Sequence, residues 1–168
     1  MAFGNVLAVV TGDRSDEMVV AQAADLVRPI KGQLHALYVI RIDRALPVDA
    51  EVPPAVARAE DVLQGVEEQV RLPRGDVEAG LLQARALGPA VVQEASNRSV
   101  DAIVMGTSYP TEHGAFSLGE DINYVLEHAP CLVVLWREPA SRRKSRNGRT
   151  AAGRNGTISA WEQRAARR

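Results

Sequence analysis

The residues with the clearest chemical potential lie in the stretch VMGTSYPTEHGAFSLGED, from Val104 to Asp121. A short apolar run ends near Gly106, a polar segment follows, and Gly119 opens a predicted helix. This layout is typical of loops that hold phosphate, because glycine lets backbone N–H groups approach an anion and a helix N-terminus attracts negative charge. The stretch therefore indicates a nucleotide site, with Gly106, Thr107 and Gly119 as candidate binding residues.

Three residues of the same stretch oppose phosphate binding. Tyr109 precedes Pro110, which has no N–H donor and pushes the residue before it towards extended backbone. Glu120 falls in the first helical turn, where two unit charges about 4 Å apart repel by roughly 4 kcal/mol at an effective dielectric of about 20. That repulsion is worth about a thousandfold in affinity. We expect a degenerate site whose glycines serve a turn and a helix start, unless a bridging Mg²⁺ screens Glu120 or Asp121.

A second group of candidates follows the first predicted strand, in TGDRS. There Gly12 would clear space for a ligand beside Thr11, and Asp13 would supply a carboxylate. Backbone groups at Val39 and Ile40 could hold an adenine ring without needing a particular side chain. The same residues also fit an ordinary strand-to-helix turn. If a nucleotide binds, AMP or a nucleoside would be tolerated better than ATP.

The other reactive side chains give little sign of catalysis. His35 lies in an apolar strand and His128 near a helix end, so both are expected to be structural. His113 has no defined nucleophile nearby, Cys131 precedes an apolar run, and their spacing matches no zinc pattern. The sequence therefore predicts a protein that is not an enzyme and holds no metal. A slow nucleotide hydrolase is the weakest of the alternatives.

Apolar runs and helix signals define the elements that must position these residues. The runs are continuous, as expected for strands covered on both faces, and helices are predicted to begin between them. The strands are expected at Val6–Val10, Leu34–Ile40, Ala102–Met105 and Cys131–Trp136, with a weaker edge strand at Asp76–Leu82, and the helix starts at Ser15, Pro53–Pro54, Gly88–Pro89 and Gly119. This order predicts an open, mostly parallel α/β sheet, in which ligands bind at the carboxyl ends of the strands.

Charge divides the chain into two parts. Residues 1–136 contain 10 Lys/Arg and 19 Asp/Glu, a net charge of −9, whereas residues 137–168 contain 10 Lys/Arg and 2 Asp/Glu, a net charge of +8. We therefore expect a globular domain over residues 1–138 and a basic, disordered tail over 139–168. No stretch suits a membrane span or a secretion signal, and the single Cys131 suits a reducing compartment, so a cytoplasmic location is predicted.

Residues 5–138 resemble the universal stress proteins. The resemblance is carried by VLAVVTGDRS, LHALYVI, VDAIVMG and LGEDINYVLEHAPCLVVLWRE. It implies a flavodoxin-like fold with strand order 3-2-1-4-5 and helices on both faces. It also implies a homodimer formed through the last strand, for which the candidate interface residues are Cys131, Val133, Leu135 and Trp136. The ending resembles stress-protein domains fused to amino-acid permeases, which makes a membrane transporter one candidate partner.

Many members of that family bind ATP through a motif G-x2-G-x9-G-[ST]. In this sequence Gly106 and Gly119 match the first and third glycines, whereas Tyr109 and Glu120 replace the second glycine and the Ser/Thr. Thr11 stands where relatives often have Asp. The resemblance therefore implies a regulatory or adaptor module that does not bind ATP, and its main alternative is an AMP- or ATP-binding stress sensor.

The basic tail is the expected contact element. Its candidate docking residues are Arg142, Arg143, Lys144, Arg146 and Trp161, with a short helix predicted over 159–166 from the capping-box spacing of Ser159 and Glu162. Such a tail could bind nucleic acid, an anionic membrane surface, or the acidic body of its own or a partner subunit. Alternatively, it is a solvated tail without a binding role.

Overall fold

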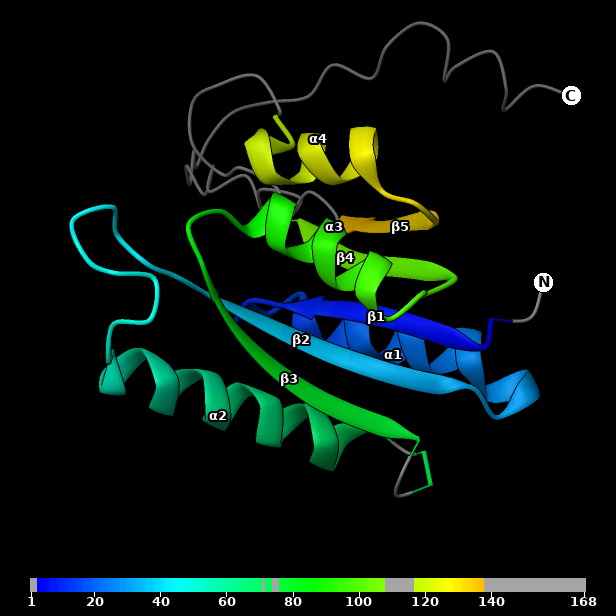
Figure 1. The fold of residues 1–168 in the computed structure, drawn as a ribbon. Coiled ribbons are helices and arrows are strands. Elements are labelled where there is room, and N and C mark those ends of the chain that lie inside the picture. Colours follow the sequence, from blue (N-terminus) through cyan, green and yellow to red (C-terminus); the bar gives the residue numbers. More distant parts are fainter. Residues whose placement is uncertain (1–2, 71, 74–75, 108–116, 138–168) are drawn as a thin grey trace, which may run out of the picture.

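The computed structural model describes residues 3–70, 72–73, 76–107 and 117–137, which form five strands and four α-helices (Figure 1). The strands are β1 (Asn5–Val10), β2 (Gln33–Arg41), β3 (Val77–Ala84), β4 (Ala102–Thr107) and β5 (Leu132–Arg137). The helices are α1 (Asp16–Val27), α2 (Pro53–Gln69), α3 (Leu87–Asn97) and α4 (Gly119–His128), and a 3-10 turn, Arg28–Ile30, follows α1.

The strands form one parallel sheet in the order β3-β2-β1-β4-β5. β1 lies in the middle, where Val6 is opposite Leu34 of β2 on one side and Ala102 of β4 on the other. Asp101, just before β4, accepts hydrogen bonds from the amides of Gly4 and Asn5 at 2.7 and 2.9 Å. The predicted flavodoxin-like order and the edge position of β3 are both confirmed.

Helices cover both faces of the sheet, which explains the continuous apolar runs (Figure 1). Val6, Ala8 and Val10 of β1 pack towards α1 and α2, whereas Leu7 and Val9 pack towards α3 and α4. Each such buried Val or Leu contributes roughly 1.5–3 kcal/mol to stability. The carboxyl ends of β1, β2 and β4 are thereby fixed next to the first turns of the following helices.

The helix starts agree with the sequence signals, with one difference in detail. α2 begins at Pro53 and α4 at Gly119, as predicted, and α3 begins one residue before Gly88. Ser15 directly precedes α1, but its side chain makes no capping hydrogen bond, because its own backbone is already helical (φ −71°, ψ −22°). Among the described residues, no helix is long and apolar enough to cross a membrane.

Candidate functional site

A hollow at the carboxyl ends of the strands lies between β2 and α2, and we name it the α2-side cavity. Its volume is about 540 Å³, within the usual range for small-molecule sites. Its walls come from the end of β1, the second half of β2, the first turns of α2 and the start of α3. The lining residues are Thr11, Tyr38, Val39, Ile40, Arg41, Pro54, Ala55, Arg58 and Leu87.

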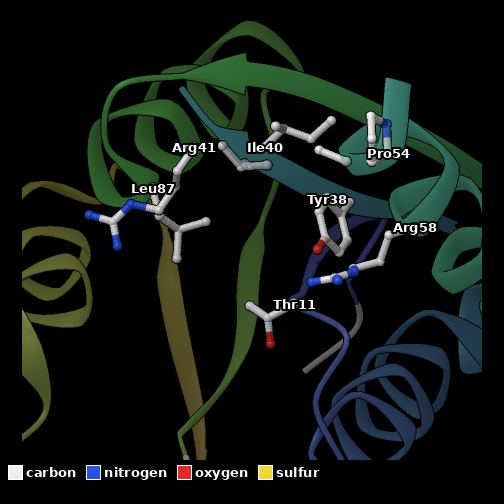
Figure 2. Close-up of a pocket in the computed structure, with 9 residues that line it drawn as sticks. Thr11, Tyr38, Ile40, Arg41, Pro54, Arg58 and Leu87 are labelled. Carbon is white, nitrogen blue, oxygen red and sulfur yellow. The ribbon is translucent and has the colours of Figure 1, made fainter. Parts of the chain in front are cut away.

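Two arginines of this cavity behave differently. Arg58, in the second turn of α2, points into the hollow towards Thr11 and lies beside the Tyr38 ring (Figure 2). Arg41, at the end of β2, instead turns towards α4, where its Nη1 lies 3.5 Å from Oδ2 of Asp121. Arg58 is therefore the cation that faces the space inside the cavity.

A smaller hollow of about 190 Å³ adjoins the first, and we name it the α4-side cavity. The two cavities share the lining residues Thr11 and Leu87, so they adjoin, and we refer to the pair as the groove. The remaining walls are the ends of β1 and β4 and the first turn of α4, namely Val9, Met105, Gly106, Leu118, Gly119, Glu120, Asp121 and Ile122. The charged side chains that line the α4-side cavity, Glu120 and Asp121, are both carboxylates.

Glu120 and Asp121 have distinct surroundings. Asp121 accepts a hydrogen bond of 2.9 Å from the amide of Gly88 in the first turn of α3, and so neutralises part of that helix end. Glu120 is exposed at the start of α4, as the sequence predicted, although its exposure lets solvent screen part of the expected repulsion towards phosphate. The N-termini of α3 and α4, which face the groove, are therefore already next to carboxylates of the chain itself.

A third carboxylate, Asp16, holds the turn after β1. Its Oδ2 accepts hydrogen bonds from the amides of Gly12 at 2.7 Å and Thr11 at 3.1 Å. Burial raises the pKa of the Asp16 carboxyl, while these amide hydrogen bonds act against the rise. Two donors that could have met a ligand anion are thus already paired within the chain.

The two glycines of the phosphate-loop pattern have structural explanations. A Cβ on Gly106 would lie 2.7 Å from Oγ and 2.8 Å from Cβ of Ser15, and 3.0 Å from Val19 Cγ2, so this glycine lets α1 pack against β4. Gly119 has φ +78°, and among the described residues nothing lies within 4 Å of an added Cβ, so glycine is favoured here by the backbone conformation. These findings support turn and packing roles over phosphate binding.

The structure brings only part of the predicted set to the groove. Thr11 lines both cavities, Val39 the α2-side cavity, and Gly106 and Gly119 the α4-side cavity. The other three candidates, Gly12, Asp13 and Thr107, line neither cavity. Asp13 instead accepts a hydrogen bond from Thr11 Oγ1 at 3.2 Å, while the buried Thr107 ends β4. Tyr109, Pro110 and His113 lie outside the described residues.

Sequence reasoning missed Arg58, Tyr38 and Asp16. Tyr38 stood inside an apolar run and Arg58 on a charged helix, and only the packing of α2 against β2 brings them together. Asp16 gave a faint signal, since a carboxylate at the first position of a helix lies close to the turn before it. Its contact depends on Gly12, whose φ of +85° turns the chain back over the helix start.

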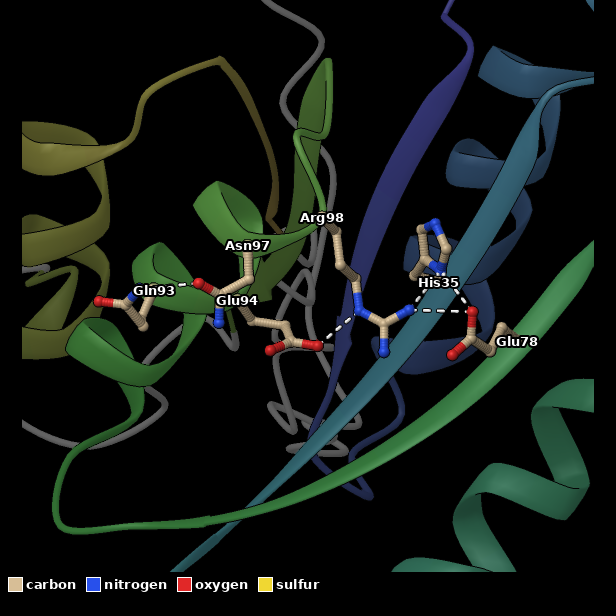
Figure 3. A network of polar contacts seen from close by, with 6 residues as sticks. All are labelled: His35, Glu78, Gln93, Glu94, Asn97 and Arg98. Atoms are coloured by element: carbon tan, nitrogen blue, oxygen red, sulfur yellow. Dashed lines mark hydrogen bonds and ion pairs between the residues drawn. The ribbon is translucent and has the colours of Figure 1, made fainter.

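A second polar cluster lies at the opposite, amino end of the sheet (Figure 3). Arg98, which follows α3, donates a hydrogen bond to Nδ1 of His35 at 2.9 Å and lies 2.9 Å from Glu78 Oε2, while its Nε bonds to Glu94. Burial, followed by the Arg98 charge, lowers the pKa of the His35 imidazole. The same Nδ1 also lies 3.2 Å from Oε2 of Glu78, so the His35 ring is held between Arg98 and Glu78.

The predicted dimer residues lie in or directly before β5, the last strand of the described sheet. Val133, Leu135 and Trp136 are half-buried in β5, and Cys131 precedes the strand. Burial raises the pKa of the Cys131 thiol, which disfavours the reactive thiolate. The tail residues Arg142, Arg143, Lys144, Arg146 and Trp161 lie outside the described residues. Within the described part of the chain, no group of three or more His, Cys, Asp or Glu side chains is placed to hold a metal ion.

Comparison with solved structures gives the same fold at low sequence identity. UspA from Lactobacillus plantarum is 20% identical with a TM-score of 0.58, covering 82% of this chain and 99% of its own. The Archaeoglobus fulgidus universal stress protein in complex with dAMP is 17% identical with a TM-score of 0.63, covering 80% and 98%. An Arabidopsis thaliana family protein with AMP bound is 14% identical with a TM-score of 0.57, covering 84% and 96%.

Sequence comparison supplies the family assignment. A search of curated protein sequences gives no match. The profile of the universal stress protein family, however, matches residues 2–137, which is nearly the whole acidic part of the chain. With the strand order and the continuous apolar strands described above, this match shows that the chain belongs to the universal stress protein family.

Proposed function

We propose that this chain is a cytoplasmic regulatory or adaptor module that does not bind ATP, is not an enzyme, and acts through dimerisation and partner contacts. The main support for the proposal is the negative charge of the chain at the place where phosphate would bind. Glu120 and Asp121 line the α4-side cavity, and Asp16 already accepts the hydrogen bonds of the first-turn amides. A triphosphate would have to displace or approach three carboxylates of the chain itself.

The proposed contacts are made by β5 and by the basic tail. β5 is the last strand of the sheet in the described chain, and its first residue, Leu132, is 47% exposed, which supports pairing with a second copy through Val133, Leu135 and Trp136. The charge of +8 over residues 137–168 supports an acidic protein partner for the tail. A membrane transporter is one such partner, and nucleic acid or an anionic surface is the alternative target.

An adenine-nucleotide sensor is the second candidate function. It is favoured by the α2-side cavity of about 540 Å³, which reaches Val39 and Thr11, two of the predicted ligand contacts. It is also favoured by structural neighbours solved with AMP, dAMP and cAMP. If the chain has this function, AMP binds, and the two extra phosphates of ATP add no binding affinity.

The deciding experiment is a search for nucleotide bound to the full chain. The protein is purified without added ATP and denatured, released adenine compounds are identified by mass spectrometry, and ATP and AMP are titrated with Mg²⁺ by calorimetry. We expect no ATP and no micromolar ATP binding. The double variant Tyr109→Gly, Glu120→Ser should gain ATP affinity; a loss of existing affinity would instead show that the site was never lost.

The tail is tested by deleting residues 142–168. We expect the deleted chain to retain its fold and dimer but to lose partner capture in a pull-down, because the docking residues are gone. An unchanged set of partners would exclude the tail as the contact element. A shift from dimer to monomer in the variant Val133→Asp, measured by sedimentation, would assign the dimer contact to β5.

A further inference from the structure

A strip of surface follows the outer side of the described sheet, where α2 runs alongside the end strand β3 (Figure 1). Two hollows of about 390 and 470 Å³ lie on this strip. The first reaches Gln83 near the carboxyl end of β3, and the second reaches Val77 at its amino end. The two hollows therefore follow the length of the strand, and we name the strip the α2–β3 seam.

The seam is lined by carboxylates around an apolar floor. Residues 49–69 contain six Asp/Glu and one Lys/Arg, a net charge of −5. Five of the six acidic residues line the two hollows, namely Asp49, Glu51, Glu60, Glu67 and Glu68. All five are exposed, and within the described residues none has an ion-pair partner. Apolar residues lie between them in both hollows, namely Val52, Val56, Val70, Leu72 and Val77.

The fold holds part of this seam in place. Arg85, directly after β3, donates hydrogen bonds to three carbonyls of the loop that follows β2, namely those of Ile42, Asp43 and Leu46. Asp49 and Glu51 lie between this contact and the first residue of α2. The carboxylates of the first hollow are thus presented from a loop tied to β3 and from a helix. Such preorganisation lowers the entropy lost when a partner binds.

We propose that the α2–β3 seam binds the basic tail of its own chain, with residues 142–149 lying along the carboxylates of the seam. The tail, residues 139–168, contains nine Lys/Arg and one Asp/Glu, a net charge of +8. Five of the basic residues fall within the eight residues RRKSRNGR, from 142 to 149. The inference goes beyond the proposed function, because a tail held on the seam has to be released before it can contact an acidic partner.

The length of the chain allows this contact. From Val77 to Gln83, β3 rises about 20 Å, and eight extended residues span about 26 Å. The strand register places Arg137, the last residue of β5, at about the level of Leu82 in β3. The two outer strands of a five-stranded sheet are about 19 Å apart, whereas 30 extended residues reach about 100 Å. The tail can therefore cross from β5 to the seam of the same chain.

Attachment to the same chain favours this contact over the same contact between two copies. A covalently linked segment has an effective concentration in the millimolar range, well above a second copy at micromolar concentration. Exposed ion pairs are individually weak, so several have to act together, and salt screens them. We therefore expect docking that is reversible and lost at high salt, which suits a segment that also engages a partner.

Zero-length cross-linking of the full chain tests the inference, because the tail has one lysine, Lys144, and the rest of the sequence one more, Lys31. A carbodiimide joins a lysine amine to a carboxylate in contact with it, and mass spectrometry of the digested protein identifies the pair. We expect Lys144 to be joined to the carboxylates of the seam. The yield should fall at least about threefold between about 0.05 and 0.5 M NaCl, because the Debye length falls below the reach of the contact.

An equal mixture of isotope-labelled and unlabelled chains shows which chain supplies the tail. We expect Lys144 cross-links within one chain. Links that join labelled to unlabelled chains would assign the tail to a second copy and overturn the inference. Links spread equally over Glu17, Asp25 and Glu127, or no links to the described residues, would also overturn it. The proposed function survives each of these results, because the tail is then open to another protein.

Charge-matched variants provide a second readout on the full chain. The seam variant carries Glu60→Gln, Glu67→Gln and Glu68→Gln, and the control variant carries Glu17→Gln, Asp25→Asn and Glu127→Gln. All six side chains are exposed, so both variants should keep the wild-type melting temperature. The seam variant should bind immobilised heparin, a polyanion, at least about threefold more tightly than the control, because a larger fraction of its tails is released. Equal heparin affinity of the two variants would contradict docking on the seam, whereas the partner pull-down tests the proposed function separately.

Discussion

The two ends of the sheet treat charge in opposite ways. At the amino end, Arg98 contacts His35, Glu78 and Glu94, so charges of both signs are paired within one cluster (Figure 3). At the carboxyl end, Arg41 pairs with Asp121 at 3.5 Å, but Arg58 faces one cavity and Glu120 lines the other, so these two charges are separated along open space. Paired charges hold elements together, whereas separated charges beside a hollow are available to a ligand.

The difference shows which polar residues are structural. His35 is the most buried histidine in the described chain, yet its partners come from β3 and α3 and satisfy it without a ligand. Arg58 is an exposed residue on a charged helix, yet it lines the α2-side cavity. Burial alone would therefore have pointed to the amino end of the sheet rather than to the cavities at its carboxyl end.

The largest expected effect tests whether the carboxyl end is shaped by packing. Gly106→Val should lower the free energy of unfolding by about 3 kcal/mol, because the new side chain overlaps Ser15 and Val19 of α1. Gly65→Ala is the matched control, since an added Cβ on this α2 residue meets nothing within 4 Å and should stabilise by about 0.5–1 kcal/mol. Urea denaturation measures both. A cost below about 0.5 kcal/mol for Gly106→Val would return this glycine to the list of ligand residues.

The next effect concerns the paired end. Arg98→Ala should lower the free energy of unfolding by about 2 kcal/mol, because Glu94, whose side chain is 14% exposed, loses its ion pair and His35 keeps only its contact with Glu78. Arg28→Ala, which breaks an exposed pair with Asp25, should change stability by less than about 0.5 kcal/mol. Equal effects of the two variants would mean that the cluster is no more than a surface ion pair.

A third prediction concerns the pH dependence of stability, which we expect to depend on His35 at the amino end of the sheet. The folded protein binds a proton at His35 less readily than the unfolded chain does, so stability should fall as pH drops through about 6.5. One such group contributes at most about 1.4 kcal/mol per pH unit. His35→Gln should flatten this part of the stability curve, whereas Gln93→Ala, near the same cluster, should keep it. An unchanged slope in His35→Gln would place the pH dependence elsewhere.

The smallest effect is expected at Ser15. A serine that caps a helix contributes about 1 kcal/mol, but the Ser15 side chain makes no capping bond. Ser15→Ala should therefore change the melting temperature little, corresponding to less than about 0.5 kcal/mol. Asp16→Ala should cost more, because the amides of Thr11 and Gly12 lose their acceptor. The reverse ranking would restore the capping role that the sequence predicts for Ser15.

Much of the fold could be predicted from the sequence, because local patterns carry the information. Continuous apolar strands, and helix starts at Pro53 and Gly119, follow from burial on two faces and from backbone preferences. The strand order came from the family resemblance, since apolar runs do not say which strands are neighbours. The sequence predicts ligand residues at the carboxyl ends of the strands, because parallel sheets bind ligands there, and both cavities lie at those ends.

The chemistry of the groove was harder to predict, because it depends on contacts between distant elements. Tyr38 and Arg58 belong to different elements, and nothing in their local sequence says that they meet. Asp13 was expected to act as the carboxylate of the first turn, yet Asp16 takes the amide hydrogen bonds because Gly12 reverses the chain. Position on a strand was therefore predictable, whereas the direction and partner of a side chain were not.

The central place of β1 has a consequence for synthesis on the ribosome. Gly4 and Asp101, which join β1 to β4, are 97 residues apart, so one edge of the first strand stays bare until most of the domain has been made. At about 5–20 residues per second this lasts for about 5–20 seconds. During that time Val6–Val9 offers an apolar strand edge to other nascent chains. We therefore expect fragments that end before Ala102 to aggregate, and chaperones to bind the chain until β4 emerges.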